Sequence, residues 1–255
     1  MEFSNENTEK IIHPAKNEGK IGAVILASGD SRRFASGQKL LADFHGRPLV
    51  EYVFKTALTP WIDTRIAVTR WQEVRNICRA LEIPCLFHDK PLLSDTIRLG
   101  LSHLAGIPEQ IFSENTQRTF SKNAQRTFLE NAHGTSSGNM QFLSNAPDAC
   151  IFLQGDQPLL RSESIKALVL AFRQDQRFCY RLSYGNTAGS PILFPKRFFP
   201  ELLCLPPDCG GGYVIRKYPD LVKTVEARHP AELLDADTEE ALHQLSTLNQ
   251  PFQEV

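Results

Sequence analysis

Short apolar runs alternate with amphipathic stretches along most of the chain. The run from Ala23 to Leu26 lies between small and polar residues, and a similar run leads to Gly155. Apolar runs of this length are typical of buried strands, whereas apolar residues at every third or fourth position indicate helices. The pattern predicts strands at 21–27, 64–69, 83–88, 149–154, 179–184, 191–194 and 221–226, and helices at 48–58, 71–81, 95–104, 162–174, 196–203, 210–217 and 238–247. Pro48 suits the first turn of the first helix.

Alternating strands and helices favour an α/β fold, in which a mainly parallel sheet is covered by helices on both faces. Residues 21–250 fit a single domain of this kind, preceded by a polar segment at 1–20 that we expect to be a flexible tail. Residues 106–147 interrupt the pattern, because they are rich in Ser, Asn, Thr, Gln and Gly. They contain a short duplication, NTQRTF at 115–120 and NAQRTF at 123–128, which is too brief for a repeat architecture. We predict a flexible surface insertion here, with a short helix around 120–130.

The first candidate for chemistry is the segment from Ala27 to Arg33, which follows the first predicted strand and precedes Lys39. It combines small residues, backbone amides and fixed cations, which a polyanion bound close to the backbone requires. Neither G-x-G-x-x-G nor G-x-x-x-x-G-K-[ST] occurs, so a dinucleotide-binding Rossmann motif and a P-loop are both excluded. The segment indicates a nucleoside triphosphate site, although small and basic residues also occur in ordinary solvated loops.

The second candidate is Asp156, which follows an apolar strand and Gly155 and precedes Pro158 within two residues. A glycine at this point allows a turn that directs the carboxylate away from the end of the strand. One or two carboxylates of this kind suit Mg²⁺, which takes its other ligands from water and phosphate oxygens. An aspartate that only caps the turn before the next helix is the structural alternative.

Composition narrows the classes of function. A net charge of −1 gives no basic field for nucleic acid, and the apolar fraction of 42% is ordinary for a globular protein. No apolar run has the length of a membrane span, and the first residues contain no apolar signal core, so we expect a cytoplasmic protein. The six cysteines form no C-x-x-C pair and the seven histidines have no ligand spacing. Free thiols are therefore expected, and no zinc site.

Four motifs in matching order resemble the molybdenum cofactor nucleotidyltransferases, over roughly residues 21 to 245. They are ILASG-x-SRRF-x4-KLL from Ile25, GDQP from Gly155, Gly189-Ser190-Pro191, and LLDADTEE from Leu233. The GSP motif together with FFPELL, Asp208-x-Gly210-Gly211 and LLDADT is most similar to the cytidylyltransferase branch that serves molybdenum hydroxylases. The resemblance implies a three-layer α/β/α Rossmann-like nucleotidyltransferase fold.

The resemblance also implies the roles of particular residues in Mg²⁺-dependent transfer of a nucleotidyl group from CTP to the terminal phosphate of molybdopterin, with release of pyrophosphate. The catalytic residues would be Arg33, Lys39, Asp156 and Asp237. The nucleotide would contact Leu26, Ala27, Ser28, Gly29, Ser31, Arg33, Lys39, Ser94, Asp95 and Thr96. The acceptor would contact Gly189, Ser190, Pro191, Asp208, Gly210 and Gly211. The metal would be held by Asp156 and Asp237, with Asp235 as the alternative to Asp237.

Asp235 and Asp237 stay unresolved at this level, since residues two apart on an extended segment face the same side and both could also start the helix that follows. The chain departs from the family at Gly212, where an arginine is common, and Arg216 could supply the missing cation. Ala27-Ser28-Gly29 favours CTP, because guanylyl-transferring relatives tend to have two glycines there. The alternatives are GTP or another triphosphate as donor, and a non-catalytic carrier of the molybdenum cofactor. The expected partners are the nucleotide, molybdopterin, and a molybdenum hydroxylase or its chaperone, without nucleic acid or membrane.

Overall fold

A seven-stranded sheet forms the centre of the described part of the chain, with its strands in the order β5-β4-β1-β6-β8-β7-β9. The structure is a computed structural model, which describes residues 19–31, 33–34, 37–107 and 143–248. The strands are β1 (Ile21–Ala27), β4 (Thr64–Thr69), β5 (Cys85–Phe87), β6 (Ala149–Gln154), β7 (Cys179–Tyr184), β8 (Thr187–Pro195) and β9 (Val222–Glu226). Only β8 runs antiparallel to its neighbours in this sheet, so the carboxyl ends of the other strands share one edge.

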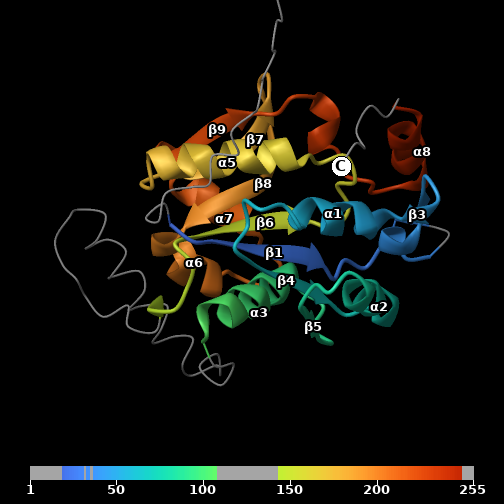
Figure 1. The fold of residues 1–255 in the computed structure, drawn as a ribbon, viewed down its shortest axis with the longest axis horizontal. Helices are drawn as coiled ribbons and strands as arrows, with labels where there is room; N and C mark the ends of the chain where they lie inside the picture. Colours follow the sequence, from blue (N-terminus) through green and yellow to red (C-terminus); the bar gives the residue numbers. More distant parts are fainter. Residues whose placement is uncertain (1–18, 32, 35–36, 108–142, 249–255) are drawn as a thin grey trace, which may run out of the picture.

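Helices cover both faces of the sheet, which confirms the predicted three-layer α/β fold (Figure 1). One face packs against α1 (Leu49–Ala57), α2 (Gln72–Ala80), α5 (Ser162–Gln174) and α8 (Glu239–Thr247). The other face packs against α3 (Leu93–Ala105), α6 (Phe199–Leu203) and α7 (Gly211–Lys217). Short 3₁₀ turns complete the chain at Lys39–Leu41, Lys196–Phe198, Pro219–Leu221 and Pro230–Leu233.

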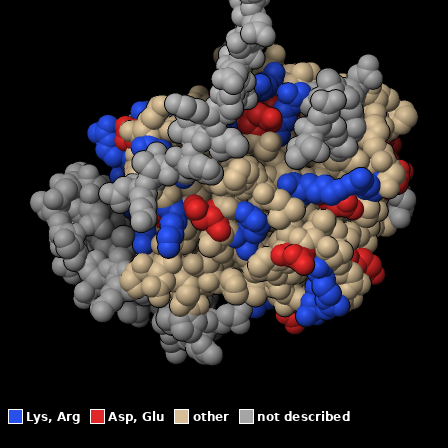
Figure 2. All heavy atoms as spheres, in the orientation of Figure 1, with Lys and Arg blue, Asp and Glu red and all other residues tan. Residues whose placement is uncertain are grey.

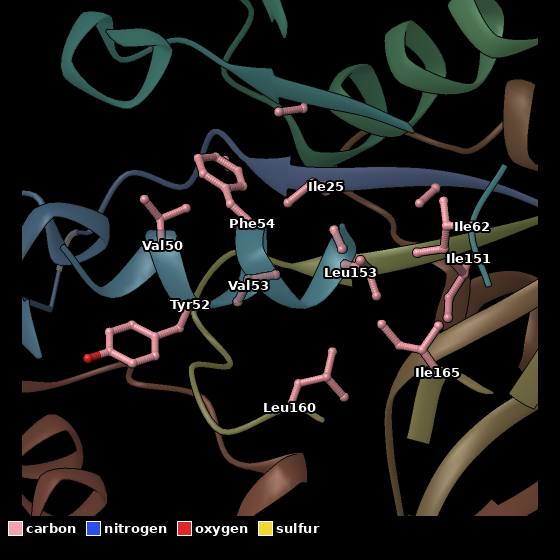
Figure 3. Packing of buried hydrophobic residues seen from close by; sticks show 14 of the residues in the cluster. Ile25, Val50, Tyr52, Val53, Phe54, Ile62, Ile151, Leu153, Leu160 and Ile165 are labelled. Atoms are coloured by element: carbon pink, nitrogen blue, oxygen red, sulfur yellow. The ribbon is translucent and has the colours of Figure 1, made fainter. Parts of the chain in front are cut away.

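The core between the sheet and helices α1, α2, α5 and α8 shows why the apolar runs form strands. Val53 and Phe54 of α1 lie over Ile25 of β1 and Leu153 of β6, and all four side chains are buried (Figure 3). Parallel strands covered on both faces need apolar side chains at successive positions, as the run that contains Ile25 has. Burial of such side chains contributes roughly 1.5–3 kcal/mol each before the entropy cost of folding.

The predicted bounds of four strands and one helix agree with the structure, and the remaining ones differ by a few residues. The pattern missed a small hairpin of β2 (Asp43–Phe44) and β3 (Arg47–Pro48), in which His45 and Gly46 both have positive φ. Two-residue strands are too short to show an alternation, so only the turn could have indicated them. Pro48 belongs to this hairpin and precedes α1, so its expected place in the first helical turn is wrong.

The expected tail and most of the expected insertion lie outside the described residues. The two ends of residues 106–147 are described, and there Ile107, Leu143 and Ala146 are buried in the core shared with α3 and α6. All six cysteines are free thiols, as expected, and three of them are buried.

The visible surface mixes the two signs of charge. Figure 2 shows basic and acidic side chains interspersed on one face, in keeping with the net charge of −1. Over the described residues, every helix is too short or too polar to cross a membrane.

Candidate active site

The loop after β1 is held by side chains from the end of β4 and the turn that follows it. Thr69 Oγ1 donates to the carbonyl of Ala27 at 2.7 Å, and Trp71 Nε1 donates to that of Gly29 at 3.1 Å. The amides of Gly29 and Ser31 make no hydrogen bond within the described residues. Amides left open at the carboxyl end of a strand are donors for phosphate oxygens.

Gln38 closes the same loop from its other side. Ser31 Oγ donates to the Gln38 side chain and accepts from the backbone amide of Lys39 at 2.9 Å, while Gln38 Nε2 donates to Gly29 at 3.3 Å. Ser31 has a φ of 55°, a conformation that non-glycine residues adopt uncommonly. These bonds stabilise the turn and bring Lys39 back beside the loop.

His88, just beyond β5, was not expected from the sequence. Its Nδ1 accepts the backbone amide of Lys90 at 3.1 Å, so its Nε2 carries the proton and donates to Ser28 Oγ at 2.9 Å. Ser28 is buried and in turn donates to the carbonyl of Val68 at 3.0 Å. Burial, with the nearby cations Lys90 and Arg70, lowers the pKa of His88 against the opposing effect of Asp95 and Asp89. A neutral imidazole therefore holds Ser28, the second residue of the segment from Ala27 to Ser31, which we call the nucleotide loop.

The turn after β6 brings two distant carboxylate segments together. The amide of Gly155 donates to the carbonyl of Leu26 at 3.0 Å, and a Cβ at Gly155 would lie 3.0 Å from that oxygen, so a side chain there would crowd β1. The amide of Ala236 donates to the carbonyl of Asp156 at 2.9 Å. This bond aligns the segment that contains Asp235 and Asp237 beside Asp156.

Lys39 lies between the two acidic segments. Its ammonium donates to Asp156 Oδ2 and, at 2.9 Å, to Asp237 Oδ1, while Arg33 contacts Asp237 Oδ2 at 2.6 Å. Burial alone lowers the pKa of Lys39, but the charges of Asp156 and Asp237 outweigh it and raise the pKa above its ordinary value. Burial likewise opposes ionisation of Asp237, but Lys39 and then Arg33 lower its pKa. The four residues expected to be catalytic therefore form one continuous network.

Asp235 contacts neither cation directly, in contrast to Asp237. Burial, reinforced by the charges of Asp156 and Asp237, raises its pKa to about 6, and its Oδ1 is buried without a hydrogen bond. The cap of α8 is Thr238, whose side chain accepts from the amide of Ala241, so neither aspartate caps that helix. Within the described residues, no three His, Cys, Asp or Glu side chains are grouped closely enough to hold a metal ion by themselves.

The residues expected to bind the acceptor lie at the start of β8, in the loop before α7 and, for Gly211, in the first position of α7. Ser190 Oγ accepts from Gln154 Nε2 at 2.9 Å, and its peptide bond to Pro191 is cis. Gly189 lies against Leu233, the residue before Leu234 in the acidic segment, because a Cβ there would be 3.0 Å from the leucine side chain.

The loop before α7 reaches both α3 and the sheet. A Cβ at Gly210 would lie 2.9 Å from Leu93 at the start of α3, and one at Gly211 would lie 3.0 Å from the ring of Phe194 in β8. Asp208 in the same loop is exposed and has a φ of 58°. The absence of side chains at the two glycines therefore permits close packing of this loop.

The three expected nucleotide residues at the start of α3 lie in its first turn, because the helix begins earlier than predicted. The side chains of Ser94 and Thr96 are buried, and Asp95 forms an ion pair with Arg98 at 2.7 Å. Within the described residues, these three do not join the network around Lys39. The structure also shows Gln154 and Arg181 beside the expected acceptor residues. Both lie inside predicted strands, where the sequence pattern gave no sign of a binding residue.

Known structures share the fold of this chain. A nucleotidyl transferase from Methanothermobacter thermautotroptrophicus matches with a TM-score of 0.63 and 17% identity, over 89% of this chain and 96% of that one. A mycobacterial homologue of Rv0371c, from Mycobacterium sp. strain JC1, matches with a TM-score of 0.61 and 16% identity, over 89% and 94%. A CMP:2-keto-3-deoxy-manno-octonic acid synthetase in complex with CTP matches with a TM-score of 0.57 and 14% identity, over 90% and 98%. At these identities the likeness shows the fold.

Sequence comparison resolves the family. No curated protein shows a sequence match to the chain. The family model described as the MobA-like NTP transferase domain matches residues 23–223, which include the nucleotide loop, Lys39, Asp156 and the start of β8. The protein therefore belongs to the MobA-like NTP transferase domain family and is a nucleotidyltransferase by family.

Proposed function

We propose that the protein transfers a cytidylyl group from CTP to the terminal phosphate of molybdopterin, releasing pyrophosphate and forming the cytosine dinucleotide cofactor of molybdenum hydroxylases. The observation that carries this proposal is the network in which Lys39 joins Asp156 and Asp237 beside open amides of the nucleotide loop. Nucleotidyl transfer asks the protein mainly to position phosphates and to offset charge, which these groups can do.

CTP is favoured as the donor by the loop Ala27-Ser28-Gly29 and by the kind of proteins that share the fold. One neighbour was solved with CTP, and a 4-diphosphocytidyl-2C-methyl-D-erythritol synthase from Anaerococcus prevotii matches with a TM-score of 0.53 at 13% identity. Molybdopterin is favoured by the resemblance of the GSP and LLDADT motifs, in combination, to the cytidylyltransferases that serve molybdenum hydroxylases.

Mg²⁺ fits the residues around Lys39. Asp156 and Asp237 both contact one ammonium group, so a cation already lies between them, and Asp235 adds a buried oxygen without a partner. Two carboxylates, with waters and phosphate oxygens as the other ligands, are the usual protein share of a Mg²⁺ site. A neighbour of similar fold, Rv0371c from Mycobacterium tuberculosis, was solved with manganese. When bound, the ion would offset charge at the reacting phosphates.

The groups of the chain around the ion would bind and orient the phosphates. The amides of Gly29 and Ser31 would hold phosphate oxygens, and Lys39 would turn from Asp156 toward the triphosphate. Arg33, which is mostly exposed, would offset the charge of the departing pyrophosphate. The protein would thus bind and orient both phosphates, with no covalent intermediate on the chain.

The test offers CTP, GTP, ATP and UTP separately with Mg²⁺ and molybdopterin, and measures pyrophosphate release and nucleotide-linked pterin. We expect turnover with CTP, and a loss of about 1,000-fold in Asp156→Ala, because a charge-positioning group at the reacting centre is removed. Asp220→Ala is the matched control, since Asp220 is exposed and precedes β9 at the opposite edge of the sheet. Preference for GTP would replace the cytidylyl proposal with a guanylyl one. Tight pterin binding without turnover would instead favour a non-catalytic carrier of the molybdenum cofactor.

A further inference from the structure

The sheet face under α3, α6 and α7 has one patch of strand residues that stay half-buried. The patch consists of Leu26 in β1, Gln154 in β6, Ser190 in β8 and Arg181 in β7, and we call it the sheet floor. In β1, β6 and β7 these are the single positions of intermediate burial, while the residues before them are buried.

The strand registers place the side chains of the sheet floor on the same face. Leu26 pairs with Gln154, and Gln154 donates to Ser190, two residues before Ile192. Arg181 also pairs with Ile192, which packs in the core under α3, α6 and α7. Paired residues on neighbouring strands point to the same side of a sheet, so the side chain of Arg181 lies on the same face as Leu26, Gln154 and Ser190, opposite Ile192 and two residues along β8 from Ser190.

The charge of Arg181 has no counterpart within the described residues. Its Nε and one terminal nitrogen donate to the carbonyl of Gly189 at 3.3 Å and 3.2 Å, and no carboxylate among the described residues pairs with it. Within the described residues its other terminal nitrogen makes no hydrogen bond, and it is not among the buried unpaired atoms. Burial lowers the pKa of Arg181. A half-buried guanidinium bound only to a carbonyl is unfavourable unless an anion completes its surroundings.

We propose that Arg181 binds the phosphate group of the acceptor substrate and thereby selects phosphorylated acceptors. This inference rests on the proposed function for the identity of the acceptor, because it adds a residue to that same site. The sheet order puts β6 and β8 between β1 and β7, a separation of about 14 Å at ~4.8 Å per strand. Arg181 therefore lies on the acceptor side of Asp156, away from the loop that holds the nucleotide.

The guanidinium has the geometry for this role. Its two bonds to Gly189 fix the fork at the start of β8, directly before Ser190, and leave one edge free for an oxyanion. Planar guanidinium groups bind phosphate through paired charge-assisted hydrogen bonds, which a lysine ammonium cannot reproduce. Gln154 and Ser190 provide further polar atoms on the same face of the sheet.

The first test compares wild type, Arg181→Gln and Arg181→Lys in steady-state assays with CTP and molybdopterin. Arg181→Gln keeps a donor for Gly189 but removes the charge, so kcat/KM for the acceptor should fall about 10- to 100-fold, mainly through KM. The KM for CTP should stay within about twofold, and Arg181→Lys should recover only part of the loss. Arg79→Gln, an exposed arginine on α2, is the control. An unchanged acceptor KM in Arg181→Gln, or equal losses for CTP and acceptor, overturns the proposal.

A second test does not depend on the identity of the reaction. Phenylglyoxal modifies accessible guanidinium groups, and peptide mass spectrometry gives the rate at each arginine with and without inorganic phosphate. Phosphate should slow the modification of Arg181 and leave Arg79 unchanged. If wild type turns over no triphosphate, the proposed function fails while this assay still decides the role of Arg181. Modification of Arg181 that phosphate does not slow overturns the anion site.

Discussion

The site has a nucleotide half and an acceptor half, and the chain itself fixes the geometry of the first more fully than that of the second. In the nucleotide half, Thr69, Trp71 and Gln38 bind carbonyls of the loop after β1. In the acceptor half, glycines permit close packing of the backbone, and no carboxylate among the described residues pairs with Arg181. Preorganised donors favour a ligand whose phosphates always bind in the same place, as a nucleoside triphosphate does. In the acceptor half, by contrast, the charge of Arg181 would be balanced by the second substrate.

Among the variants that follow, the largest effect should come from Lys39, which lies between the two acidic segments. Lys39→Met removes the ammonium between Asp156 and Asp237, so turnover should fall about 100- to 1,000-fold because charge on the reacting phosphates is no longer offset. Without Mg²⁺ the variant should also be less stable, by up to about 3 kcal/mol, since the carboxylates then repel one another. Steady-state assays and thermal unfolding measure the two effects.

Mg²⁺ should raise the melting temperature of Lys39→Met more than that of wild type, because the ion then replaces the missing cation. Lys55→Met is the control, since Lys55 pairs with Glu51 on the surface of α1. Equal Mg²⁺ effects in Lys39→Met and wild type would show that the carboxylates do not form a cation site.

A smaller effect, confined to the nucleotide half, is expected at His88. His88→Ala removes the donor to Ser28, so the KM for CTP should rise about 3- to 10-fold while the KM for the acceptor stays unchanged. This selectivity is the reverse of that expected for Arg181→Gln. The control is His103→Ala on the exposed side of α3. Losses of similar size for both substrates would remove the division between the two halves.

The same histidine predicts a pH dependence. Its folded pKa lies below the ordinary value of 6.5, so the unfolded chain binds more protons as the pH falls through that range. The stability from neutral His88 is therefore full above the ordinary pKa and decreases toward the lowered one. Protonation would also remove the acceptor at Nδ1 that holds Lys90. Between about pH 7.5 and about pH 5.5, melting temperature should fall more in wild type than in His88→Ala. A parallel fall in both would contradict this assignment.

The elements that the sequence predicted well are those in which burial determines the residue type. Long apolar runs such as the one around Ile25 gave the bounds of β1, because both faces of a central parallel strand are buried. The start of β8 was missed, since Thr187 and Ala188 are exposed and show no alternation. Its antiparallel direction depends on the hairpin with β7, which the pattern of apolar residues does not encode.

The site divides in a similar way. Lys39, Asp156 and Asp237 occur in motifs, and in the structure Lys39 contacts both aspartates directly. His88 and Arg181 carry no local signal, because their meaning depends on strands that meet only in the folded sheet. Asp235 and Asp237 also differ only in the fold, where Lys39 contacts Asp237 directly and does not contact Asp235.

The smallest change in stability should accompany Arg33→Gln. The side chain of Arg33 is 69% exposed, and an ion pair at such a position contributes less than about 1 kcal/mol, so thermal unfolding should barely change. Turnover should nevertheless fall about 10-fold, because a cation that is weakly bound to Asp237 is free to turn toward phosphate. Arg177→Gln is the matched control, since Arg177 is 76% exposed and also pairs with an aspartate, Asp175. If both variants lose equally little stability but only Arg33→Gln loses turnover, the ion pair at Asp237 serves the substrate. Unchanged turnover in both variants would instead show that Arg33 does not offset charge on the phosphates, so that Lys39 is the one side chain of the nucleotide half that does so.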